Sequence, residues 1–280
     1  MKTDEYANYD RRLYTSANPG FLIFLVNQGC GDEQQAISIA HIVNRTIDRI
    51  IQTNWDGVAP KERCFISVIG YNHNIKELCS GWLKELDKNP LRYEILKRKF
   101  PDGAGGIIEI EVKQPVWVEP ITQDGATNML GAFTFAKELA GKWISDNPDG
   151  PAPIIINISD GVPFYEGKDS HLYLQESITM ADKIKILSNE NENVLLLNAV
   201  LSPLSEAQKI REKYLRVDNN AARMSSDIPL ELMNEIERLL LINCLDMQIF
   251  QTLKKGYVYG DVQQASNLLT LITETHFPTS

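Results

Sequence analysis

The sequence predicts a doubly wound α/β fold: a mostly parallel sheet with an antiparallel edge strand and helices on both faces. Short apolar runs, typical of strands buried on both faces, recur along the chain. Segments with apolar residues at helical spacing separate these runs, and polar loops follow several of them. This alternation continues through most of the 280 residues. We therefore expect residues 1–280 to form a single domain, with an insertion at the sheet edge at about 81–115.

The first strand and helix define the pattern. Residues 21–26 are six consecutive apolar residues after a glycine, as expected of a buried strand. The polar, glycine-containing loop 27–31 follows. Apolar residues then recur at helical spacing from Ala36 to Ile51, which predicts a helix ending near residue 54. In open parallel sheets, ligands bind at the carboxyl ends of such strands.

A second strand is predicted at 64–71, and the turn-rich residues 72–74 predict a hairpin to an antiparallel strand at 75–79. Within the insertion, residues 86–99 are predicted to be helical and residues 107–112 to form an exposed strand. The insertion contains too few apolar residues for a separate core.

The alternation resumes after the insertion and continues to the end of the chain. We expect strands at 116–118, 154–158, 193–200 and 257–259, with 154–158 central. The expected helices are 128–144, 173–187, 205–214, 228–245 and 262–273.

Charge and cysteine usage limit the function. The net charge of −9 argues against a protein that binds nucleic acid or an anionic membrane, because both need a basic face. The first residues lack the apolar segment of a signal peptide, and no apolar run reaches the ~20 residues that a membrane helix needs. The four cysteines form no CxxC pair, which is typical of a reduced, cytoplasmic protein.

Three loops are expected to meet at the carboxyl edge of the sheet. They are residues 27–31, 124–127 and 159–161. The segments Gly-Ala-Thr-Asn-Met-Leu at 125–130 and Ile-Ile-Ile-Asn-Ile-Ser-Asp-Gly at 154–161 are specific. They resemble the von Willebrand factor A (vWA) domain over nearly the whole chain. The arrangement is most similar to that of intracellular bacterial members, some of which are associated with tellurite-resistance and stress operons.

The resemblance implies that the three loops form a metal-ion-dependent adhesion site, but the first loop departs from the family pattern D-x-S-x-S. Asn27, Gly29 and Gly31 stand where the family has a carboxylate and two hydroxyls. Thr127 and Asp160 match the other two family ligands. Mg²⁺ prefers six oxygen ligands including one or two carboxylates, and here only Asp160 is a family-derived anion. We therefore expect a degenerate site without metal.

Several alternatives remain open for these residues. The site can still bind Mg²⁺ or Mn²⁺ through Thr127 and Asp160, with the Asn27 amide as a third ligand. Asp160 can instead serve the turn after its strand, and Thr127 can cap the following helix.

The loop at 162–168 follows the third strand of the site and contains Phe164 and Tyr165. These aromatic residues either anchor a protein interface at the rim or fold back over the end of the sheet. The resemblance implies a non-catalytic protein-binding module that uses this edge. The predicted partner-binding residues are Asn27, Gln28, Gly29, Gly31, Thr127, Asp160, Phe164 and Tyr165.

An enzyme that binds a nucleotide near Gly29 and Gly31 is the alternative function. The dinucleotide pattern is incomplete because Gln34 occupies the third glycine position, and no phosphate loop is present. Ser159 does not lie in a GxSxG motif. The four histidines lack metal-ligand spacing, and we expect His41 to be partly buried on the first helix. We therefore predict no enzymatic activity.

Overall fold

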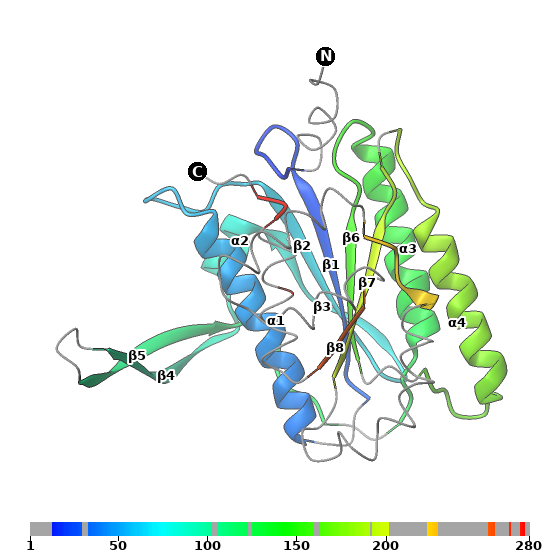
Figure 1. Ribbon diagram of the computed structural model, residues 1–280, viewed down its shortest axis with the longest axis horizontal. Helices are drawn as coiled ribbons and strands as arrows, with labels where there is room; N and C mark the ends of the chain where they lie inside the picture. The colour runs from blue at the N-terminus through cyan, green and yellow to red at the C-terminus, as the bar shows by residue number, and fades with distance from the viewer. Residues whose placement is uncertain are drawn as a thin grey trace.

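The structure is a computed structural model that describes residues 13–29, 33–101, 106–122, 125–159, 163–190, 192–201, 223–228, 257–260, 269 and 275–277. Figure 1 shows its arrangement, a central sheet flanked by helices and a two-stranded ribbon that projects to one side.

The central sheet has six strands among the described residues, in the order β3-β2-β1-β6-β7-β8. All neighbours are parallel except β2 and β3, which form an antiparallel hairpin. The strands are β1 (Gly20–Asn27), β2 (Cys64–Tyr71), β3 (Ile75–Trp82), β6 (Ile154–Ser159), β7 (Leu195–Leu201) and β8 (Tyr257–Gly260). The predicted fold class is confirmed.

The apolar residues of β1 supply both faces of the sheet. Leu22, Phe24 and Val26 pack with the apolar face of α1 (Glu33–Thr53). The alternate residues pack with α3 (Met129–Asp146) and α4 (Ser170–Lys185) on the opposite face. Burial on both faces explains why β1 is a continuous apolar run rather than an alternating one.

The strand register brings the polar loops to one edge. Asn27 at the end of β1 lies level with Tyr71 at the end of β2, and Val26 lies level with Ile158 of β6. The segments that follow these strands therefore leave the sheet side by side, at the lower end of the view in Figure 1.

A buried chain of hydrogen bonds crosses the sheet beneath this edge. The Tyr71 hydroxyl donates to Asn157 Oδ1 at 2.7 Å, reaching across β1. Asn157 Nδ2 donates to Asn198 Oδ1 at 2.8 Å, and Asn198 Nδ2 donates to Ser225 Oγ at 2.9 Å. Polar groups at such depth need partners of this kind, and the chain ties β2, β6, β7 and residues 223–228 together.

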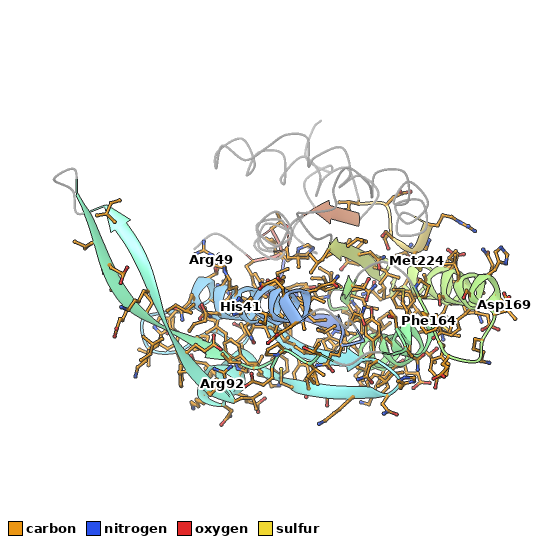
Figure 2. All side chains as sticks on the ribbon, turned by 90° about the horizontal axis from the view of Figure 1, so that it is seen from below. His41, Arg49, Arg92, Phe164, Asp169 and Met224 are labelled. Atoms are coloured by element: carbon orange, nitrogen blue, oxygen red, sulfur yellow. The ribbon has the colours of Figure 1, made fainter. Side chains whose placement is uncertain are left out.

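The insertion contains the short helix α2 (Leu83–Lys88) and two strands, β4 (Arg92–Pro101) and β5 (Ile107–Val116). The strands form a separate antiparallel ribbon. It projects away from the body in both Figure 1 and Figure 2. The predicted strand at 107–112 is confirmed as part of β5, whereas the predicted helix at 86–99 is wrong except for residues 86–88, which are helical as the end of α2. Pro90 disfavours the helical conformation at Asn89, where α2 ends, and the following residues pair with β5 instead.

The strand predicted at 116–118 is also wrong, because only Val116 belongs to a strand. Asn44 on α1 holds the next two residues instead. Its Oδ1 accepts the Trp117 and Val118 N–H groups at 2.8 and 3.0 Å, and its Nδ2 donates to the Val118 carbonyl at 2.8 Å. One buried amide thus satisfies the backbone groups that a neighbouring strand would have paired.

The remaining elements follow the prediction where the structure describes them. The helices predicted at 128–144 and 173–187 correspond to α3 and α4, and the strands predicted at 193–200 and 257–259 correspond to β7 and β8. The helices predicted at 205–214, 228–245 and 262–273 fall almost entirely outside the described residues. No helix in the described part of the chain is both long and apolar enough to cross a bilayer.

Candidate functional site

The first loop leaves β1 in a compact turn. Asn27 Oδ1 accepts the Gly29 N–H at 2.9 Å, and the Gln28 N–H donates to the Tyr71 carbonyl at 2.8 Å, which extends the pairing with β2 by one residue. The Gln28 side chain lies over Gly70, where an added Cβ would be 2.2 Å from Oε1. Asn27 and Gln28 are both buried. Their amides therefore shape the loop.

The first loop touches the second at Gly29. A Cβ placed on Gly29 would lie 2.3 Å from the Ala126 carbonyl oxygen, so the two backbones are closer than any side chain allows. The loops at 27–29 and 125–128 therefore meet, as the sequence predicts.

The second and third loops are joined by backbone hydrogen bonds. The Thr127 N–H donates to the Phe164 carbonyl at 2.7 Å, and the Phe164 N–H donates to the Thr127 carbonyl at 3.2 Å. This short antiparallel bridge fixes the segment after β6 against the segment before α3. The Thr127 side chain is buried and does not cap α3. The cap is Asn128, whose Oδ1 accepts the Gly131 N–H at 3.0 Å, so the alternative role of Thr127 as a cap is wrong.

The turn between β2 and β3 is a fourth part of the site that the sequence did not reveal. The Asn128 N–H donates to the Asn72 carbonyl at 3.1 Å, and the Ala126 N–H points to His73 Nε2 at 3.4 Å. His73 occupies the space over Gly125, where a Cβ would lie 2.5 Å from Nε2 and where φ is +147°. Only spatial contact links His73 to this loop, and no spacing in the sequence indicates it.

Aromatic side chains connect the turn, the third loop and α4. The rings of His73 and Tyr165 are 6.0 Å apart at 71°, and those of Tyr165 and Tyr173 are 5.9 Å apart at 39°. The Tyr173 hydroxyl donates to Asn128 Oδ1 at 2.7 Å. Burial raises the pKa of Tyr173 to about 12, so the hydroxyl stays protonated as a donor at neutral pH.

The sequence left open whether Phe164 and Tyr165 lie exposed at the rim or fold back over the end of the sheet, and the structure shows one residue in each position. Phe164 is 45% exposed and stands at the rim, whereas Tyr165 is half-buried and folds back against His73 and Tyr173. Phe164 is thus the exposed aromatic side chain of the loops at this edge, within the described residues.

Six of the predicted site residues are therefore brought to one edge: Asn27, Gln28, Gly29, Thr127, Phe164 and Tyr165. Gly31 and Asp160 lie outside the described residues. Cys30 in the first loop and Asp124 at the start of the second loop also lie outside them.

The described residues of the site do not fit a divalent cation. Asn27 and Thr127 offer neutral oxygens, and Asn27 Oδ1 already accepts a hydrogen bond. Gly29 has no room for the hydroxyl side chain that the family pattern places there. Across the described ranges, no group of three or more His, Cys, Asp or Glu side chains is arranged to hold a metal. Mg²⁺ and Mn²⁺ prefer oxygen ligands that include carboxylates, which these residues lack.

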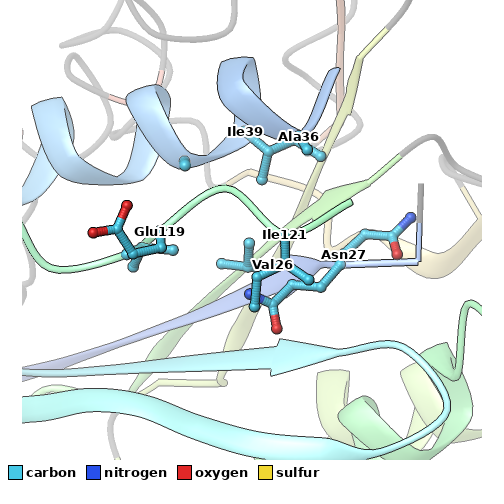
Figure 3. Close-up of a pocket in the computed structure, with 9 residues that line it drawn as sticks. Val26, Asn27, Ala36, Ile39, Glu119 and Ile121 are labelled. Atoms are coloured by element: carbon cyan, nitrogen blue, oxygen red, sulfur yellow. The ribbon is translucent and has the colours of Figure 1, made fainter. Parts of the chain in front are cut away.

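A small cavity adjoins the end of β1. It lies between Val26, Asn27, Ala36, Ile39 and Ile121, as Figure 3 shows, and has a volume of about 10 Å³. This volume is close to the minimum for one water molecule, whereas ligand pockets are typically ~300 Å³ or more. A nucleotide has no room in this cavity.

A larger cavity of about 240 Å³ lies between α1 and the base of the ribbon, next to the small one, with which it shares Ala40 and Val118. Arg92 lines this cavity and binds both oxygens of Glu119, at 2.6 and 2.9 Å, and Glu94 at 2.6 Å. The His41 side chain lines this cavity and is 51% exposed, so its predicted partial burial is wrong. It sits on the polar face of α1, and the apolar face of that helix packs on the sheet.

Comparison with solved structures supports the fold. The pilus adhesin SpaC from Lactobacillus rhamnosus GG, in its open conformation, superposes with a TM-score of 0.52 and 10% identity over 92% of this chain and 30% of SpaC. The vWF domain of the pilus tip protein Mfa5 from Porphyromonas gingivalis gives 0.48 and 10% identity, over 92% of this chain and 95% of that domain. Manganese-loaded TRAP from Plasmodium vivax gives 0.43 and 14%, over 91% and 74%.

The sheet order and the likeness to SpaC together identify a vWA-like α/β fold. The chain spans less than a third of SpaC. Comparison of the sequence with family models and with curated protein sequences gives no match.

Proposed function

We propose that this chain is a non-catalytic, vWA-type module that binds a protein partner through the loops at the carboxyl edge of its sheet, without a metal ion. The observation that carries the proposal is the exposed Phe164 ring, which lies on a loop whose backbone and neighbouring side chain are both fixed by contacts. The Thr127 bridge fixes its backbone, and the neighbouring Tyr165 packs on His73. An aromatic side chain on a preorganised backbone is the kind of residue that anchors protein interfaces.

The chemistry of the edge supports a protein partner. The described loop residues from Asn27 to Gly29, from Gly125 to Asn128 and from Pro163 to Tyr165 are uncharged. Those of them that reach the surface, such as Phe164 and Tyr165, are partly apolar, and an uncharged, partly apolar surface is typical of the centre of a protein interface. The small volume beside Asn27 disfavours the alternative of a nucleotide-binding enzyme. SpaC is a pilus adhesin, but at 10% identity it supports only the fold on which such binding is built.

We propose binding without a metal because the described residues at the ligand positions of the loops are poor ligands for a divalent cation. The residues at the first-loop positions are an amide and a glycine in close backbone contact, and the second loop contributes one buried hydroxyl. Binding in this module would therefore depend on shape and apolar contact rather than on an ion shared between the two proteins.

Affinity capture with the intact chain, followed by mass spectrometry, supplies candidate partners, and calorimetry with each purified candidate tests the surface. We expect Phe164→Ala to weaken binding by about 30-fold, the ~2 kcal/mol typical of a buried aromatic anchor. Ile186→Ala is the matched control, because Ile186 is 74% exposed and lies beyond the opposite end of α4. Equal affinity of Phe164→Ala and the wild type would reject this surface.

A further inference from the structure

The β4–β5 ribbon has two distinct faces. Toward α1 it presents Glu94, whose Oε2 is 3.9 Å from His41 Nε2, and Gln114, whose Nε2 donates to Asp48 Oδ2 at 3.1 Å. The alternate residues point the other way, and we call them the outer face. Its members are Tyr93, Ile95, Lys97, Ile107, Glu109, Glu111 and Lys113.

The outer face exposes more apolar surface than a solvated ribbon should. Tyr93 is 55% exposed, Ile95 63% and Ile107 73%. An isolated two-stranded ribbon is only marginally stable in water and normally packs its apolar side on a further layer. No helix or strand of the described chain packs extensively on this face, and Figure 2 shows the far part of the ribbon standing clear of the helices and the central sheet.

Opposite charges face each other across the middle of the outer face. Lys97 on β4 lies directly opposite Glu111 on β5, and its Nζ is 3.4 Å from Glu109 Oε1. On this face β4 therefore carries the positive charge of Lys97, and the middle of β5 carries the negative charges of Glu109 and Glu111. At the base, Ile95 lies opposite Lys113, and Tyr93 lies opposite Pro115.

We propose that a second copy of this chain covers the outer face, related by a two-fold axis that runs along the ribbon. Such an axis places β4 of one copy over β5 of the other, with residues of the same level in contact. Lys97 then faces Glu111 of the second copy, Ile95 lies on the aliphatic stem of Lys113, and Tyr93 lies on Pro115. The pairing of Lys97 with Glu111 within one ribbon is thereby repeated between the copies, and the two-fold axis makes each contact occur twice.

The geometry permits this arrangement because the base of each ribbon, through Glu94 and Gln114, packs its inner face toward its own α1. The two bodies therefore lie on opposite sides of the stacked ribbons. The contact uses the same patch on both copies, so it closes as a dimer and does not propagate.

Joining two copies edge to edge fits the charges less well. If β5 pairs antiparallel with its copy so that Glu109 faces Lys113, Glu111 must face Glu111. Like charges directly opposite one another destabilise a strand pair. The face therefore favours stacking over strand addition.

The size of the contact predicts a weak dimer. Ten-residue strands extend about 33 Å, and two strands are about 10 Å wide, so each copy contributes roughly 330 Å², well below the ~800 Å² per partner of a standard specific interface. We expect dissociation in the micromolar range and weaker association at high salt, because the ion pairs are exposed.

Sedimentation velocity over a concentration series tests the proposal with two charge-reversed variants of the full chain. Lys97→Glu with Lys113→Glu makes the described charges of the outer face acidic, and Glu109→Lys with Glu111→Lys makes them basic. Each variant alone should be at least ~10-fold weaker as a dimer, because like charges then face each other. An equimolar mixture should dimerise again, since an acidic ribbon then meets a basic one.

The control Lys142→Glu with Lys183→Glu makes the same change in net charge as Lys97→Glu with Lys113→Glu, but at exposed sites on α3 and α4, and it should dimerise as the wild type does. Thermal melts of all variants check that the body is folded. A wild type that stays monomeric at every concentration overturns the proposal. Undiminished dimerisation of either variant, or a mixture that remains monomeric, also overturns it.

Discussion

Gly29 sets how closely the first two loops approach each other. The vWA pattern that this chain resembles has a hydroxyl residue at that position, and the backbone of Ala126 occupies the space that its Cβ would need. The glycine at this position and the close contact of the loops therefore go together. A hydroxyl side chain at this position requires the second loop to move, so a substitution alone cannot introduce it without strain.

Substitution at Gly29 should therefore destabilise the protein. We expect Gly29→Ser and Gly29→Ala to lower the free energy of unfolding by about 1–3 kcal/mol, the usual cost of overpacking against a rigid neighbour. Chemical denaturation measures the change. Gly141→Ala on α3 is the control, because a Cβ there meets nothing within 4 Å. It should stabilise by about 0.5–1 kcal/mol, since glycine is unfavourable inside a helix. Equal stability of Gly29→Ala and the wild type would contradict the close contact.

At the scale of elements, the hydrogen-bond chain from Tyr71 to Ser225 fixes the strands that deliver the site loops. Tyr71 directly precedes the turn that contains His73, and Asn157 lies two residues before the end of β6. The position of one strand relative to another is therefore specified by buried polar groups as well as by apolar packing. Such groups disfavour alternative registers, because each of those would leave an amide without a partner.

Removing the Tyr71 hydroxyl tests this role. In Tyr71→Phe the Asn157 Oδ1 atom loses its donor in a fully buried position, so we expect a loss of about 1–3 kcal/mol in the free energy of unfolding. Denaturant titration measures it. Tyr93→Phe removes the same atom from a side chain that is 55% exposed and should change stability by less than about 0.5 kcal/mol. A Tyr71→Phe protein as stable as Tyr93→Phe would show that the chain of hydrogen bonds is not stabilising.

The elements also show how far a sequence can be interpreted. Buried strands such as β1 and β6 were predictable, because burial on both faces produces apolar runs. Their parallel arrangement in turn predicted that the loops converge. The helix predicted at 86–99 failed because apolar and charged residues alternate there in a way that suits both a helix face and a ribbon, and the decisive pairing with β5 is a tertiary contact. The role of His73 was not predictable, since its partner Ala126 is 53 residues away.

At the scale of the whole molecule, the two proposed surfaces lie on different parts of the fold. The loops occupy the carboxyl edge of the sheet, whereas the ribbon projects sideways beside α1 (Figure 1). If both proposals hold, a dimer formed through the ribbons leaves both loop surfaces free and presents two partner sites. A weak contact at each loop surface would then gain strength against a partner that offers two binding epitopes, because the second contact forms within one complex.

The thermal stability of the whole chain reports whether the site holds an ion. A ligand that binds only the folded state raises Tm, and an ion at ten times its Kd stabilises by about 1.4 kcal/mol, a rise of roughly 3 °C for a domain of this size. We expect no rise in Tm when millimolar Mg²⁺ or Mn²⁺ replaces a chelator, because the described ligands at the site are neutral and Asn27 Oδ1 is already engaged.

The matched variant for this experiment is Asn27→Asp, which places a carboxylate at the first-loop position while keeping an acceptor for the Gly29 N–H. If Thr127 and Asp160 retain ligand positions, Mn²⁺ should raise the Tm of Asn27→Asp and leave that of the wild type unchanged. The difference between the two changes in Tm then measures how much weaker cation binding is with the Asn27 amide than with a carboxylate. A rise of several degrees in the Tm of the wild type would show that the loops bind a cation. The proposal of metal-free partner binding would then fail, but the fold and the exposure of Phe164 would be unaffected.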